Sequence, residues 1–63
     1  MYELIFADEC TYNVRKLENV AEIIFNVTGL WMFANHVKEV CSKAKIGDKF
    51  EYHDVGLTIN VLK

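Results

Sequence analysis

A helical period in residues 30–45, LWMFANHVKEVCSKAK, limits what this chain can fold into more than any other feature. At about 100° per residue, most of its apolar side chains fall within one arc about 100° wide, the pattern of a helix packed on a core. The residues of this stripe are Leu30, Phe33, Ala34, Val37, Val40, Cys41 and Ala44. Trp31 and Met32 lie outside the arc, so the helix is expected to present a second contact surface besides its core face.

Residues 17–28 also have a helical period, and Gly29 is a natural left-handed stop between the two helices. Asn19 followed three residues later by Glu22 has the form of a capping box, although Leu17 and Glu18 could already be helical. The apolar positions cover an arc of about 200°, which is wider than packing on one sheet requires. They are Leu17, Val20, Ala21, Ile23, Ile24, Phe25 and Val27. The sequence therefore predicts two helices joined by a sharp turn, the first with an excess of apolar surface.

Alternation of apolar and polar residues predicts a β-hairpin on each side of the helix pair. The expected strands are residues 2–7, 10–16, 49–54 and 57–62, with turns at Asp8-Glu9 and Val55-Gly56. The predicted order is ββααββ. An α+β fold, in which two β-hairpins form a small antiparallel sheet covered on one face by two helices, buries each apolar face. The alternation leaves the strand order open, and residues 1–63 are expected to form a single compact domain.

Composition restricts the classes of function. A chain of 63 residues with 52% hydrophobic and 13% aromatic residues has more apolar surface than so small a body can bury, so we predict a homodimer. A net charge of −2 argues against a basic nucleic-acid-binding protein. The opening residues lack a signal-peptide pattern and no apolar run is long enough to span a bilayer. We therefore expect a cytoplasmic protein with reduced thiols and no membrane contact.

The spacing of the reactive side chains disfavours both metal binding and nucleophilic catalysis. The available metal-ligand types are Cys10, His36, Cys41 and His53. They lack the short paired spacing of a structural zinc site, and each cysteine is expected to pack inward as a small hydrophobe. His36 and Cys41 lie about 140° apart around a helix, and His53 and Asp54 alternate across a strand. We predict no enzyme activity, no cofactor and no metal.

Trp31 and Met32 are the strongest indication of function. Two readings stay open for Trp31: it packs against Phe25 or Leu17 of the first helix, or it takes part in an intermolecular contact. Met32 lies opposite the core stripe, and Trp and Met beside a His and mixed charges are typical of a protein interface. The predicted protein-binding residues are Phe25, Trp31, Met32, Asn35, His36 and Glu39.

We interpret the protein as a non-enzymatic protein-binding module that acts by steric block or adaptor contact. By analogy alone, it looks like the small single-surface proteins of phages and mobile elements that inhibit a host or defence protein. The alternative is a small nucleic-acid-associated regulator that uses Arg15, Lys38, Lys43, Lys45 and Lys49. A second candidate surface is the outer sheet face, with Glu3, Ile5, Ala7, Arg15, Glu51, His53, Asn60 and Leu62.

Overall fold

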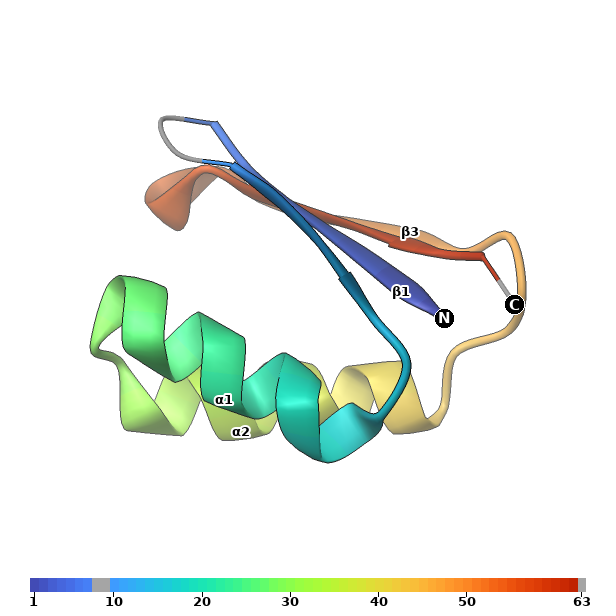
Figure 1. The fold of residues 1–63 in the computed structure, drawn as a ribbon, viewed down its shortest axis with the longest axis horizontal. Helices are drawn as coiled ribbons and strands as arrows, with labels where there is room; N and C mark the ends of the chain where they lie inside the picture. Colours follow the sequence, from blue (N-terminus) through green and yellow to red (C-terminus); the bar gives the residue numbers. More distant parts are fainter. Residues whose placement is uncertain (8–9, 63) are drawn as a thin grey trace.

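The computed structural model describes residues 1–7 and 10–62, and places two helices side by side on one face of a four-stranded antiparallel sheet (Figure 1). The elements are β1 (Tyr2–Phe6), β2 (Thr11–Val14), α1 (Leu17–Thr28), α2 (Trp31–Ser42), β3 (Lys49–Tyr52), a 3₁₀ turn η1 (His53–Val55) and β4 (Leu57–Val61). The predicted ββααββ order and the two-layer α+β class are confirmed.

The strand order is β2-β1-β4-β3, so that the two central strands come from opposite parts of the sequence. β1 and β4 pair antiparallel, from Tyr2 opposite Val61 to Phe6 opposite Leu57. Each hairpin therefore supplies one central strand and one edge strand, and the β1–β4 pairing joins the two hairpins into one sheet. On the outer face of the sheet, the Asn60 side chain donates a hydrogen bond to the carboxylate of Glu3, which lies opposite it across the β1–β4 pair.

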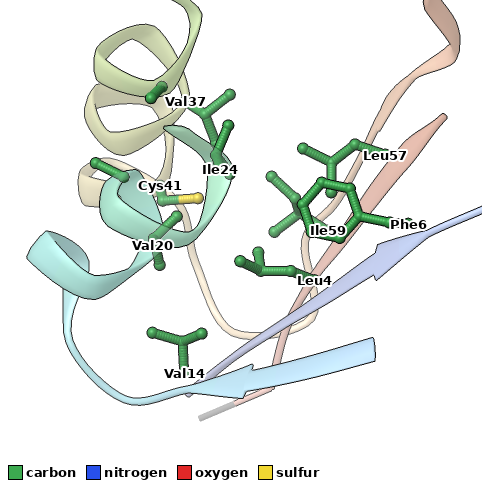
Figure 2. Close-up of a cluster of buried hydrophobic side chains, with 11 residues drawn as sticks. Leu4, Phe6, Val14, Val20, Ile24, Val37, Cys41, Leu57 and Ile59 are labelled. Carbon is green, nitrogen blue, oxygen red and sulfur yellow. The ribbon is translucent and has the colours of Figure 1, made fainter. Parts of the chain in front are cut away.

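The core lies between the sheet and the helix pair, and Figure 2 shows side chains from both layers meeting there. The largest side chains below 2% exposure are Leu4, Val20, Ile24, Val37, Cys41, Leu57 and Ile59. No polar or charged residue of the described chain is buried. The core is thus wholly apolar, and polar chemistry is confined to the surface.

α1 has the predicted bounds, residues 17–28, but its N-terminus is not capped as the capping-box pattern indicates. α1 starts at Leu17 with Lys16 as its N-cap and no capping side chain, so the capping box predicted at Asn19 and Glu22 is wrong. Both residues lie inside the helix, too far along it to cap its first turn. Gly29 ends α1 as predicted, with φ 71° and its N–H donating to the Phe25 carbonyl at 2.7 Å.

α2 is shorter than the predicted helix of residues 30–45. Leu30 is its N-cap, with extended backbone, and is exposed, so its assignment to the core stripe is wrong. At the other end the N–H groups of Lys43 and Ala44 reach back only three residues, to the carbonyls of Val40 and Cys41. These short-range bonds tighten the last turn and end the helix.

The second hairpin has a longer connection than the predicted two-residue turn at Val55-Gly56. β3 ends at Tyr52, η1 follows, and Gly56 with φ 65° returns the chain to β4. His53 and Asp54 therefore lie in the 3₁₀ turn and not on a strand.

The second strand is also shorter than predicted. Cys10 lies just before β2 and is exposed, so the prediction that it packs inward is wrong. Its parity matches that of the buried Val14, but it is outside the paired part of the strand. The turn predicted at Asp8-Glu9 lies outside the described residues.

Candidate protein-binding surface

The reactive side chains are dispersed in the structure. Cys41 is buried, whereas Cys10, His36 and His53 are exposed. Burial raises the pKa of the Cys41 thiol, the opposite of what activates a nucleophilic cysteine. Within residues 1–7 and 10–62, no three His, Cys, Asp or Glu side chains gather as a metal site would require. In the same part of the chain, no helix has the length and apolar character needed to cross a membrane.

Four exposed apolar side chains gather where α1 turns into α2. Because Gly29 reverses the chain at once, the end of α1 and the start of α2 lie next to each other. The exposed fractions are 39% for Phe25, 48% for Leu30, 59% for Trp31 and 85% for Met32. We call these four residues the turn patch. They are the largest apolar groups that the helix layer leaves in solvent.

Trp31 is held by α1 without being part of the core. Its ring meets that of Phe25 edge to face, with centroids 5.3 Å apart and planes at 86°. The predicted contact with Phe25 therefore exists, and the alternative partner Leu17 lies at the other end of α1. More than half of the Trp31 surface stays exposed, so this side chain is fixed in orientation and still accessible.

Met32 lies one position further around α2, on the side opposite the buried Ala34, Val37 and Cys41. His36, Glu39 and Lys43 follow it along the same side of the helix. The Lys43 ammonium lies 3.6 Å from the Glu39 carboxylate. Exposed polar and charged side chains thus follow the apolar Met32 along this side of α2.

A groove of about 480 Å³ lies between α1 and α2 on the side away from the sheet. Phe25 and Trp31 line one end of it, and Ala21 forms part of its floor. Charged side chains of both helices line the other end. The groove is lined by Glu18, Ala21, Glu22, Phe25, Asn26, Trp31, Asn35 and Lys38. The predicted site residue Asn35 is part of this groove and not of the Met32 side of the helix.

A second pocket, of about 460 Å³, was not predicted from the sequence. Phe33 of α2 and Tyr52 of β3 form its aromatic wall, with ring centroids 5.1 Å apart. Leu30 lines it as well, so the pocket opens beside the turn patch. The remaining lining residues are Glu51, His53, Asp54 and Val55. Neither segment alone carries a signal for this pocket, because it forms only when η1 comes against the start of α2.

The residues named for nucleic-acid binding come from several elements. Lys38 is on α2, Lys43 is its C-cap, Lys45 is in the following loop and Lys49 begins β3. The Lys49 ammonium lies 3.3 Å from the Glu51 carboxylate, and Lys43 is paired as described above. Arg15 is exposed in the connection between β2 and α1. This alternative stays a prediction.

The outer sheet face is polar along its paired rows. Asn60 donates a hydrogen bond to the Glu3 carboxylate at 2.9 Å, and the half-buried Ile5 lies between Thr11 and Thr58. Outward positions of the four described strands carry no aromatic side chain, the group on which sheet surfaces stack single-stranded bases.

Comparisons of the chain with protein-family models, with curated proteins and with solved structures gave no significant match.

Proposed function

We propose that the protein is a non-enzymatic protein-binding module, and that the turn patch is the centre of its contact surface. One observation carries this proposal: Met32 is 85% exposed at the start of a helix whose opposite face completes a closed, wholly apolar core. Neither folding nor a polar network accounts for a methionine in that position.

The physical properties of the patch suit a protein partner. Trp and Met are enriched at the centres of interfaces, where a few buried anchors supply most of the binding energy. The edge-to-face contact with Phe25 fixes the Trp31 ring before binding, which reduces the entropy lost on association. Asn35, His36 and Glu39 are exposed beside the patch and supply the polar rim that such interfaces have.

The mode of action that we propose is steric block or adaptor contact, because the proposal needs no chemistry beyond binding. A standard interface of about 800 Å² per partner would occupy about a fifth of the 4277 Å² surface of this chain. Inhibition of a host or defence protein by a phage or mobile-element protein is one form of this function, in which occupancy alone produces the effect. Self-association through the same helix layer is a further part of the proposal.

The proposal is tested by affinity capture from the native host with the wild type, Met32→Glu and Ile46→Glu. Ile46 is the matched control, because it is 72% exposed in the loop between α2 and β3. That loop lies at the opposite end of the helix layer from the turn patch (Figure 1). A charge placed in a dry interface is expected to abolish capture by Met32→Glu, whereas Ile46→Glu retains it.

Each variant is also unfolded thermally, and both should keep the wild-type midpoint because both side chains are solvated. A Met32→Glu protein that folds and binds normally would show that the turn patch is idle. A salt series separates the alternative function: capture through phosphate contacts would fall steeply with salt, and capture through an apolar patch would not.

A further inference from the structure

The groove between α1 and α2 carries opposite charges that the chain itself does not pair. Glu18 and Glu22 line it on α1, and Lys38 lines it on α2. Across residues 1–7 and 10–62, none of these three side chains makes an ion pair within 4.0 Å. The groove thus presents acids on one helix and a base on the other, all accessible to a partner.

The groove is also ordered along its length. Because Phe25 contacts Trp31, these two residues define one level along the antiparallel helix pair. Glu18 lies seven residues before Phe25, and Lys38 lies seven residues after Trp31. At about 1.5 Å per residue, both charges are therefore about 10 Å further along the groove, at matching levels. One end is aromatic, and the other carries an acid beside a base.

Two copies of the chain can face each other through this groove so that like ends and opposite charges match, but only for one direction of the two-fold axis. An axis that runs along the groove keeps every residue at its level and places α1 of one copy over α2 of the other. The two Phe25–Trp31 pairs then meet each other, and Glu18 of each copy faces Lys38 of its mate. An axis across the groove would instead set each aromatic pair against charged side chains, which costs desolvation without pairing.

We infer that the occupant of this groove is a second copy of the chain, related by a two-fold axis parallel to α1 and α2. The inference rests on the proposed function, since it uses Trp31 and Phe25 of the turn patch, and it adds the partner and its orientation. Each helix is about 18 Å long, so the four-helix contact is of modest size and is populated at micromolar concentrations.

Charge reversal tests this arrangement, with sedimentation equilibrium as the readout. Glu18→Lys alone sets Lys against Lys38 at both symmetric contacts, and Lys38→Glu alone sets Glu against Glu18. Each variant is expected to raise the dimer dissociation constant by about tenfold or more. In an equimolar mixture, a dimer with one chain of each variant has one native Glu–Lys pair and one pair with the two charges exchanged. The dissociation constant of this mixed dimer should return to within about threefold of the wild-type value.

Two controls separate this effect from changes in folding or net charge. Lys45→Glu changes the net charge as Lys38→Glu does, but lies in the loop after α2, so its dimer should be unaffected. The double variant with Glu18→Lys and Lys38→Glu in one chain should dimerise again. It keeps the Glu18→Lys change in the first turn of α1, so its recovery would show that this change does not prevent folding. Thermal unfolding of each variant confirms that the chain is folded.

A wild type that stays monomeric through the micromolar range would overturn the inference, as would single variants that dimerise normally or a mixture that does not recover. A monomeric wild type would also remove self-association from the proposed function, whereas binding of a foreign protein is decided separately by the capture experiment with Met32→Glu. Conversely, a recovering mixture would establish the two-fold contact even if no foreign protein were captured.

Discussion

The ring of Trp31 meets the ring of Phe25 edge to face across the turn between α1 and α2, at a centroid distance of 5.3 Å. This contact joins the two helices on their solvent side, while Ile24 and Val37 join them in the core. Trp31 therefore stabilises the helix pair and remains accessible at the same time. Of the two readings that the sequence leaves open for Trp31, the contact with Phe25 is present, and the exposed part of the ring stays accessible for the proposed intermolecular contact.

We expect Trp31→Ala to lower the free energy of unfolding by about 1–2 kcal/mol, because an aromatic pair contributes about 0.5–1.5 kcal/mol beyond its partial burial. A fully buried Trp would cost about 3–5 kcal/mol. Urea denaturation measures the difference, with Met32→Ala as the control that should change stability by less than about 0.5 kcal/mol. A loss near 4 kcal/mol would show that Trp31 belongs to the core.

Ile24→Ala should cost about 2–5 kcal/mol, because Ile24 is fully buried between the helix layer and the sheet. A domain of this size has only about 3–9 kcal/mol to lose, so the variant is expected to be partly unfolded at 37 °C. Ile23→Ala is the matched control on the same helix, since Ile23 is only half buried. Circular dichroism against temperature compares the two, and equal losses would contradict the packing described here.

Gly29→Ala should destabilise the protein by about 1–2 kcal/mol through the backbone alone. Gly29 has φ 71°, and a Cβ atom added there would find nothing within 4 Å. Gly29→Asn should cost less than Gly29→Ala, because asparagine tolerates the left-handed conformation better than alanine. Urea denaturation ranks the three proteins. An alanine variant as stable as the wild type would show that the turn does not need this conformation.

The two thiols should react at very different rates. A thiol reagent is expected to modify the exposed Cys10 in the native protein and to reach Cys41, which is 1% exposed, only after unfolding. Mass spectrometry of the labelled chain with and without urea distinguishes the two cysteines, and Cys10→Ser supplies the control with no native reaction. Rapid native labelling of Cys41 would mean that the helix layer opens readily.

Stability should decline at alkaline pH. Burial raises the pKa of the Cys41 thiol above its ordinary value of 9.0. Burial and the charge of Cys41 raise the pKa of Tyr52 above 10.0. Since the folded state binds these protons more tightly than the unfolded chain, their contribution is complete below pH 9.0 and is lost as pH rises through the folded pKa values.

Urea unfolding at several pH values from neutral to about 10.5 checks this dependence. The free energy of unfolding should fall less steeply above pH 9.0 in Cys41→Ala than in the wild type. In Tyr52→Phe, the free energy of unfolding should fall less steeply than in the wild type at the upper end of this pH range. Identical slopes in all three proteins would show that neither group is linked to folding.

Local patterns in the sequence were enough to predict the elements and their inward faces. The helical period of residues 17–28, the stop at Gly29 and the alternation of Leu57, Ile59 and Val61 all appear in the structure as predicted. Met32 was correctly placed away from the core on the same grounds. Each of these features depends on residues that are close in sequence, so the spacing of apolar residues along the chain is enough to predict it.

The arrangement of the elements was decided by tertiary structure. Pairing of β1 with β4 and the pocket at Phe33 and Tyr52 join segments that are distant in sequence, and the groove exists only because the two helices pack side by side. Cys10 and Leu30 have the parity or period of core residues, yet both lie at the ends of elements and are exposed. A periodicity states which face of an element is apolar, whereas burial of a given position depends on whether the opposite layer extends far enough to cover it.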